Sequence, residues 1–243
     1  MLLSSEEWEI VLLSLRVSAM AVGGSLPLAF ALAYLLARGR FPGKVLLDAL
    51  VHLPLVLPPV VTGWLLLLAF GANGPAGRWL QEWFGVSLLF RWTGAALAAA
   101  VMALPLMVRA IRLSIEAIDR RLEEAAMTLG ASRWRSFATI TLPLAFPGVL
   151  AGLVLGFARS LGEFGATITF VSNIPGETRT LPLAIYGALQ VPGADALVAR
   201  LALVSVALSL AALVASELLS RRIGGGQGGG GRGGGERGHH HVV

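Results

Sequence analysis

The sequence predicts an all-α integral membrane protein that crosses the bilayer with five helices. Of its 243 residues, 56% are hydrophobic and only 14% are charged, whereas a soluble domain averages about 25% charged residues. The apolar residues fall in runs long enough to cross a bilayer, which takes about 20 residues of helix. The chain has no cysteine, so disulfides and thiolate metal sites are excluded.

Five apolar stretches define the predicted spans, which together form one membrane domain, 1–223. The spans cover residues 10–37, 45–70, 94–113, 141–160 and 197–219. The first stretch follows three glutamates and lacks the basic leader of a cleaved signal peptide, so we expect an uncleaved first span. The glycine-rich segment 224–243, which ends in HHHVV, predicts a flexible tail outside the mechanism.

Positively charged residues mark one side of the membrane, because cytoplasmic loops retain Lys and Arg. Most of them lie after the first, third or last span, or at the end of the third: Arg38, Arg40, Lys44, Arg109, Arg112, Arg120, Arg121, Arg133, Arg135, Arg221, Arg222, Arg232 and Arg237. The connections on the other side hold Arg78, Arg91 and Arg179. This distribution predicts an outer N-terminus and a cytoplasmic C-terminus.

Two segments leave alternatives open. The segment 161–196 is apolar only in short pieces, so we expect a re-entrant or partly buried excursion, which is tolerated where protein or a water-filled cavity satisfies the backbone. A full sixth span is the alternative there. The stretch 53–63, LPLVLPPVVTG, is dense in proline, which kinks helices. It fits either ordinary packing or a bent helix that lines a cavity and moves.

The sequence contains no energy source for transport. A P-loop requires a lysine followed by Ser or Thr, but the only lysine, Lys44, precedes a valine. Proton-coupled carriers usually place ionisable groups deep in their spans, whereas Asp48, His52 and Glu163 lie near span ends, where capping or snorkelling explains them. No triad, metal cluster or carboxylate pair supports an enzyme. If ATP drives this protein, another chain hydrolyses it.

The charged segment before the fourth apolar stretch predicts a short helix, a tight turn and a second helix. Asp119 is a good N-cap for a helix that begins at Arg120. Gly130 suits the left-handed position that ends it, and Ser132 can cap a second helix that continues into the span. The alanine–glycine spacing and the arginines also fit a DNA-binding helix-turn-helix. Membrane spans at both ends favour a docking element for a cytoplasmic partner instead.

The same segment resembles the EAA signature of bacterial ABC importer permeases. Glu124-Ala125-Ala126 is followed by Gly130 and then by Ile140-x-Leu142-Pro143, at the spacing of that signature. The resemblance implies a type I importer bundle of five helices, or six if 161–196 crosses fully. It also implies that 119–135 is the coupling segment. In that family the coupling helix sits in a cleft of the ATPase, so Glu124, Ala125, Ala126 and Gly130 are the expected coupling residues.

Other stretches look like the molybdate permease subunits within that family. The matching stretches are 52–63, 104–116 and 159–186. This resemblance implies a homodimer that works with two copies of a P-loop ATPase and a periplasmic molybdate-binding protein, and that carries molybdate and tungstate. Sulfate and thiosulfate permeases are the alternative. ATP and Mg would be used by the ATPase, and this chain would bind no cofactor and no nucleic acid.

An oxyanion pathway must bind its substrate weakly, which hydroxyls and amides do better than a cluster of unpaired arginines. We take Thr167, Thr169, Ser172 and Asn173 as candidate pathway or gate residues near the outer end. Such side chains also satisfy neighbouring helices in lipid. Three hypotheses remain: an ABC importer permease that copurifies with an ATPase, an ion-driven secondary carrier, and a membrane-tethered DNA binder.

Overall fold

A computed structural model describes residues 3–224, which form helices and no strand. The elements in chain order are α1 (Ser5–Arg38), α2 (Lys44–Val56), α3 (Pro59–Phe70), α4 (Pro75–Phe84), α5 (Trp92–Glu116), α6 (Arg120–Thr128), α7 (Arg133–Ser136), the π-helical turn η1 (Phe137–Thr141), α8 (Leu142–Leu161), α9 (Gly165–Val171), α10 (Leu181–Leu189) and α11 (Asp195–Gly224). The predicted all-α class is confirmed.

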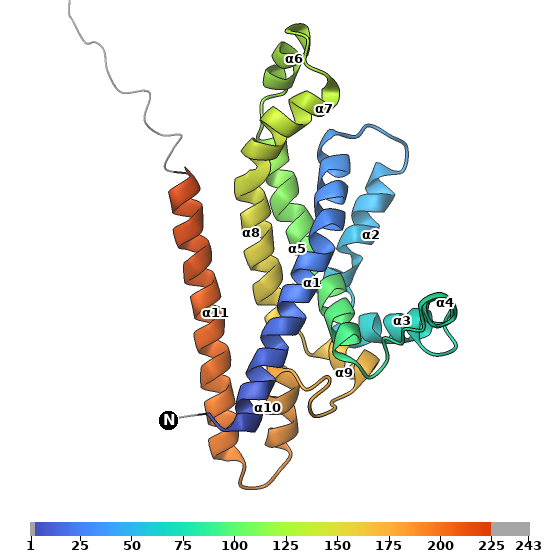
Figure 1. The fold of residues 1–243 in the computed structure, drawn as a ribbon, viewed down its shortest axis with the longest axis vertical. Coiled ribbons are helices and arrows are strands. Elements are labelled where there is room, and N and C mark those ends of the chain that lie inside the picture. The colour runs from blue at the N-terminus through green and yellow to red at the C-terminus, as the bar shows by residue number, and fades with distance from the viewer. Residues whose placement is uncertain (1–2, 225–243) are drawn as a thin grey trace, which may run out of the picture.

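The centre of the molecule is a bundle of α1, α5 and α8, with α11 beside α8 (Figure 1). Small residues bring these helices close together. Ala29 and Ala33 of α1 are fully buried in the same core cluster as Ala103 of α5. On α8, a Cβ at Gly152 would meet Ile111 of α5 at 3.2 Å. Close backbone approach through small residues is the usual way in which membrane helices associate.

Within residues 3–224, four helices are long and apolar enough to cross a membrane: α1, α5, the continuous helix Arg133–Leu161, and Asp195–Ala215 of α11. The predicted span 45–70 corresponds to α2 and α3, which are apolar enough to count together as a fifth span but are bent by 115° at the break between them. Leu57 and Pro58 cause the break. Each of them precedes a proline, a position that disfavours helical backbone, and both have extended ψ angles, 142° and 134°. The bend at 53–63 is thus observed, whereas a role of this segment in lining a cavity and moving stays a prediction.

The segment 161–196 contains two helices that are too short to cross a bilayer. α9 has 7 residues and α10 has 9, against about 20 needed for a span. α9 packs against α3, and α10 packs against α11 and α1. The described residues therefore contain the expected excursion and no full sixth span at this place.

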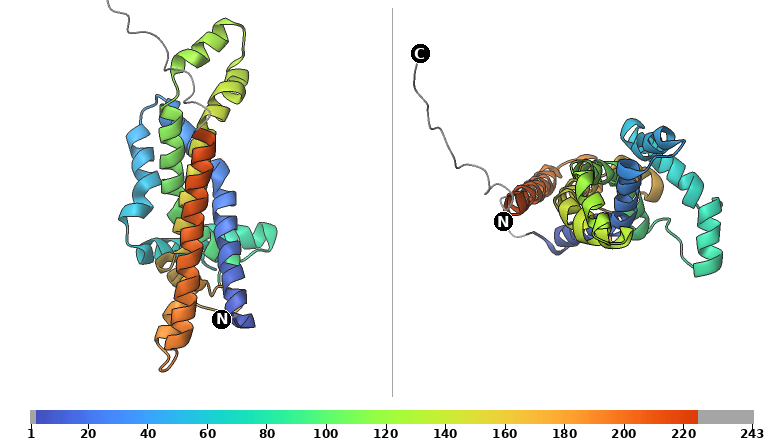
Figure 2. Two further views of the ribbon diagram at one scale, coloured as in Figure 1. Left: turned by 90° about the vertical axis from the view of Figure 1, so that its left-hand side faces the viewer. Right: turned by 90° about the horizontal axis from the view of Figure 1, so that it is seen from above.

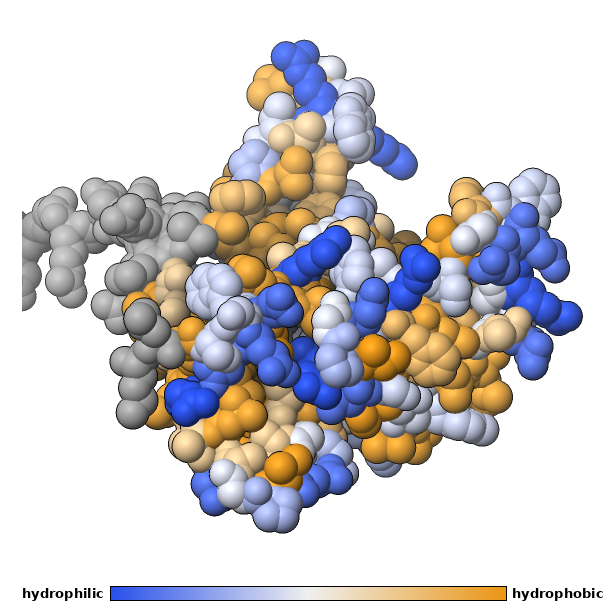
Figure 3. Space-filling view, turned by 60° about the horizontal axis from the view of Figure 1, so that its bottom comes forward, coloured by the Kyte–Doolittle hydropathy of each residue, from blue (hydrophilic) through white to orange (hydrophobic). Residues whose placement is uncertain are grey.

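The N-terminal end of α1 and the C-terminal end of α11 lie at opposite ends of the bundle (Figures 1 and 2). α6 and α7 project beyond the end at which α11 finishes. Around the other end, hydrophilic side chains gather in the middle of a largely apolar surface (Figure 3). Four charged residues there, Glu6, Glu9, Arg16 and Arg179, help to line a pocket of about 420 Å³.

Candidate coupling site

Capping side chains set the positions at which α6 and α7 begin, as the sequence predicted. The Asp119 carboxylate accepts a hydrogen bond from the backbone amide of Arg121 at 2.9 Å, and the Ser132 hydroxyl accepts one from the amide of Arg135 at 3.2 Å. Each side chain satisfies a donor that has no partner inside its helix. The two short helices therefore begin at Arg120 and Arg133.

Gly130 forms the turn between the two helices. Its φ is +90°, in the left-handed region that glycine adopts without steric cost. Its amide donates to the carbonyl of Met127 at 3.0 Å, and the amide of Ala131 donates to that of Ala126 at 3.0 Å. This pair of hydrogen bonds is a Schellman motif, and it satisfies two of the last carbonyls of α6.

A π-helical turn connects α7 to α8, a feature that the sequence analysis did not predict. The amide of Leu142 donates to the carbonyl of Phe137 across η1. Pro143 has no amide hydrogen, so the carbonyl of Thr139 loses the α-helical partner it would otherwise have. The Phe137 ring lies at the start of this turn, with its centroid 5.2 Å from that of Tyr34 in α1 and 5.4 Å from that of Trp134.

Glu123 attaches α6 to the rest of the protein. Its Oε1 accepts hydrogen bonds from the Arg38 guanidinium at 3.1 Å and from the Thr141 hydroxyl at 2.6 Å. Arg38 also donates to the carbonyl of Ile118 at 3.3 Å. Sequence reasoning missed Glu123, because the neighbouring Glu124 belongs to the recognised signature, and it used Arg38 only as a mark of orientation. The approach of residues about 80 positions apart leaves no local signal.

The segment 119–135, which projects from the bundle, has exposed apolar side chains on its surface. Leu129 is 90% exposed and Trp134 is 75% exposed. Leu122 and Met127 of α6 are 48% and 40% exposed. Glu124 and Ala125 are exposed as well, and Ala126 is half-buried. Exposed apolar residues grouped in a segment beyond the end of a bundle are typical of a protein–protein contact.

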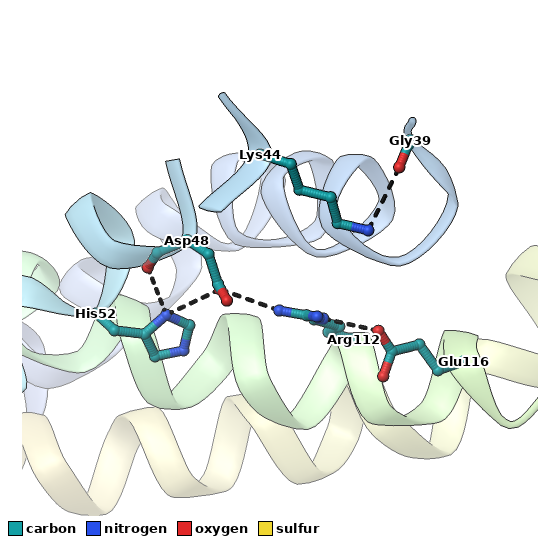
Figure 4. Close-up of polar contacts among 6 residues, drawn as sticks. All are labelled: Gly39, Lys44, Asp48, His52, Arg112 and Glu116. Carbon is teal, nitrogen blue, oxygen red and sulfur yellow. Dashed lines mark hydrogen bonds and ion pairs between the residues drawn. The ribbon is translucent and has the colours of Figure 1, made fainter. Parts of the chain in front are cut away.

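A second polar network joins α2 to α5 near the same end of the bundle (Figure 4). The Arg112 guanidinium lies between two carboxylates, 3.0 Å from Asp48 and 2.8 Å from Glu116. The His52 ring lies 3.3 Å from the Asp48 carboxylate, and its Nδ1 is 2.9 Å from the Asp48 carbonyl oxygen. Asp48 is therefore paired with the cationic side chain of Arg112, whereas a carboxylate that binds transported protons would be expected to lack such a partner.

The four candidate pathway residues lie in α9 or directly after it. The Thr169 hydroxyl donates to the carbonyl of Gly165, one turn earlier in α9. The Asn173 amide donates to the carbonyl of Leu183, and its side-chain oxygen accepts from Arg179. Thr167 is buried, whereas Ser172 is exposed and has a φ of +62°. Local structure explains the contacts of Thr169 and Asn173, and a pathway role for the four residues stays a prediction.

Two ion pairs near the opposite end of the bundle were not predicted. Glu7 is almost fully buried in α1 and lies 2.8 Å from Arg200 of α11. Glu163 is also buried: it pairs with Arg159 at 2.6 Å and caps α9 by accepting from the amide of Ala166. The capping interpretation of Glu163 is therefore confirmed. Both pairs lie near the end of the bundle that the sequence analysis predicted to face outside.

The family of inner-membrane components of binding-protein-dependent transport systems matches residues 25–225 of this chain. The chain belongs to this family. It is accordingly a multi-pass inner-membrane permease subunit of a transport system and not itself an enzyme. The described structure agrees, because residues 3–224 contain four helices that are long and apolar enough to cross a membrane.

Among relatives of this permease, the molybdenum transport system permease protein ModB of Escherichia coli K12 is 60% identical over 221 residues, which is 91% of this chain and 96% of the relative. The protein of the same name from Haemophilus influenzae is 63% identical over 209 residues, 86% and 91% of the two chains. The sulfate transport system permease protein CysT of E. coli is 44% identical over 159 residues, 65% of this chain and 57% of the relative.

Two solved structures share the fold. A bacterial ABC transporter that imports alginate matches with a TM-score of 0.71 at 21% identity, over 91% of this chain and 81% of that one. The MetNI methionine ABC transporter in an inward-facing conformation matches with a TM-score of 0.64 at 16% identity, over 89% and 94%. These likenesses confirm the fold of an ABC importer permease, which the sequence analysis expected.

Proposed function

We propose that this permease translocates molybdate across the cytoplasmic membrane as the transmembrane subunit of an ATP-driven importer. The identity of 60% to a molybdenum transport permease over nearly its whole length carries the substrate assignment. The same relationship favours tungstate as a second substrate, because the two tetrahedral oxyanions are close in size and charge. The projecting coupling segment, with its exposed Leu129 and Trp134, supports coupling to a separate motor.

In this proposal two copies of the chain form a homodimer with the pathway along its axis. Two copies of a P-loop ATPase bind the coupling segments, and ATP and Mg are used by those subunits. A periplasmic binding protein delivers molybdate to the outer end, where α1 begins. ATP binding switches the spans from inward to outward facing, and hydrolysis resets them. Alternating access of this kind requires two packings that differ by only a few kcal/mol.

The proposed orientation has the N-terminus outside and the C-terminus in the cytoplasm. Arg38, Lys44, Arg120 and Arg133 lie at the end of the bundle from which α6 and α7 project, which supports a cytoplasmic position for that end. α7 continues directly through η1 into α8, so its exposed face is held close to the membrane. This connection argues against DNA binding by the segment.

The same geometry supports the proposed coupling roles within the segment. Gly130 sets the angle between α6 and α7, and Glu124 lies exposed on α6, where an ATPase can reach it. Ala125 and Ala126 present small side chains that allow a close approach. For Thr167, Thr169, Ser172 and Asn173 we retain a weak-binding role near the outer gate, through those hydroxyl and amide groups that become free when α9 moves.

Sulfate is the second candidate substrate, supported by the 44% identity to a sulfate permease over 159 residues. Uptake of labelled molybdate in cells with and without the chain tests both assignments. We expect uptake to require the chain. Excess tungstate should inhibit uptake, whereas sulfate at the same concentration as tungstate should not. Competition by sulfate at the same concentration would move the assignment to sulfate.

A further inference from the structure

Arg38 and Glu123 form a shielded contact between the end of α1 and the coupling helix α6. Arg38 is the last residue of α1, and its side chain is only 11% exposed. The Glu123 side chain is 20% exposed, and its Oε1 lies 3.1 Å from the Arg38 guanidinium. Arg38 Nε is buried without a partner in the described residues. Loss of Glu123 would therefore leave a shielded cation with only the Ile118 carbonyl, which is costly.

The same carboxylate oxygen also bonds to Thr141, the last residue of η1. Glu123 thus joins three elements at one point: α6, the turn that leads into α8, and the end of α1. The Phe137 ring adds an apolar contact on the same side, with its centroid 5.2 Å from that of Tyr34. These residues line one cleft of about 430 Å³ between α1 and the coupling segment.

The importance of this junction follows from chain connectivity. A displacement of α6 reaches α8 through the peptide chain, because α7, η1 and α8 are continuous. α1 has no such connection, since about 80 residues separate Arg38 from α6. Nevertheless α1 packs along α5 through a large part of the core, so its position sets the shape of the bundle. The contact between Arg38 and Glu123 is a direct link through which a movement of α6 can act on α1.

We propose that Glu123 is a positioning residue that makes α1 move together with the coupling helix. Through Arg38 and Thr141 it converts one displacement of α6 into a joint displacement of α1 and α8. The inference rests on the proposed function, because it presupposes an ATPase that displaces α6. A merely structural role for Glu123 would lower the amount of folded protein but leave the number of ions transported per ATP unchanged.

The first test compares uptake with ATP hydrolysis in the reconstituted complex of permease, ATPase and binding protein. For Glu123→Ala we expect molybdate uptake per ATP hydrolysed to fall about tenfold, within the range of coupling between sites. Uptake per ATP should fall less for Glu123→Gln, which keeps the shape of the side chain. The double variant that exchanges the charges, Arg38→Glu with Glu123→Arg, should recover most of the lost uptake per ATP. Arg121→Gln is the matched control, because the Arg121 side chain is exposed on the same helix and has no ion pair among the described residues.

The second test measures the movement itself. Because the chain has no cysteine, spin labels can be placed at Leu35→Cys in α1 and Arg121→Cys in α6, two exposed positions. In the assembled complex, we expect the distance between the labels to stay the same with and without a non-hydrolysable ATP analogue. With Glu123→Ala added, the distance should change when the analogue binds.

A label distance that changes equally with and without Glu123 would overturn the inference, as would an unaltered uptake per ATP in Glu123→Ala. Failure of the proposed function has a different signature: the unaltered chain would then show no ATP-dependent uptake at all. The ratio of uptake to ATP hydrolysis separates loss of coupling from loss of folding, because a folding defect lowers the amount of intact complex and leaves this ratio unchanged.

Discussion

Gly63 of α3 and Ala166 of α9 are in direct backbone contact. A Cβ at Gly63 would lie 2.6 Å from the carbonyl oxygen of Ala166 and 2.8 Å from the Cβ of Thr169. The contact is reciprocal, because a Cβ at Gly165 would lie 2.7 Å from Pro59. Two helices that are each too short to cross the membrane thus pack tightly against one another beside the bend between α2 and α3.

Gly63→Ala should force α3 and α9 apart. The nearest atoms include backbone, which cannot rotate away, so we expect a destabilisation of about 1–3 kcal/mol, as for other overpacked sites. Thermal unfolding of the purified protein in detergent measures it. Gly23→Ala in α1 is the control, since nothing lies within 4 Å of its Cβ position. Equal stability of the two variants would show that α3 and α9 are not in close contact.

Substitutions of Gly130 should rank by their tolerance of positive φ. Space is open around its Cβ position, so only the backbone conformation at φ +90° resists a side chain. Asn tolerates this region, Ala costs about 1–2 kcal/mol, and Pro cannot adopt it and also loses the amide bond to Met127. ATP-dependent uptake should follow the order Gly, Asn, Ala, Pro. Full uptake by Gly130→Pro would refute the coupling role of the turn.

Trp134→Ala should weaken assembly with the ATPase. Buried tryptophans at interface centres commonly contribute 2 kcal/mol or more, so binding should fall by roughly thirtyfold. Copurification and titration of the ATPase with the purified permease measure the effect. Trp83→Ala is a matched control, because Trp83 is 74% exposed in α4, far from the coupling segment. Equal loss with both variants would contradict a docking surface on α6 and α7.

Asp48→Asn should leave transport within about twofold of the unaltered chain. Asp48 is 39% exposed and its contact with Arg112 needs only an acceptor oxygen, which asparagine keeps. An ion-driven secondary carrier that uses Asp48 for protons would lose uptake altogether. Measurement of uptake with ATP present, and again with the ion gradients collapsed, distinguishes the two mechanisms.

Much of the fold follows from sequence pattern because long apolar runs and local caps carry their own signals. The predicted span 94–113 lies within α5, and 10–37 lies within α1, whose start is a capping box formed by Ser4 and Glu7. Both ends of α6 and the start of α7 followed from Asp119, Gly130 and Ser132. Each of these features depends on residues a few positions apart.

The remaining features depend on contacts between distant residues. The prolines marked the bend between α2 and α3. Because α3 is apolar on all sides, its sequence does not show which face packs against the rest of the protein. No local pattern singles out Glu123, because its partner Arg38 comes from the distant helix α1. The candidate pathway residues were chosen by chemical type alone, and the observed bonds of Thr169 and Asn173 are with their own neighbourhood.

The most direct test of the account is uptake of labelled molybdate into proteoliposomes that contain this chain, its ATPase and the binding protein. We predict that uptake requires ATP on the side of the membrane from which α6 and α7 project. Tungstate should inhibit this uptake, whereas an equal concentration of sulfate should leave it unchanged. Uptake without ATP, driven by an ion gradient across the same vesicles, would contradict the central claim.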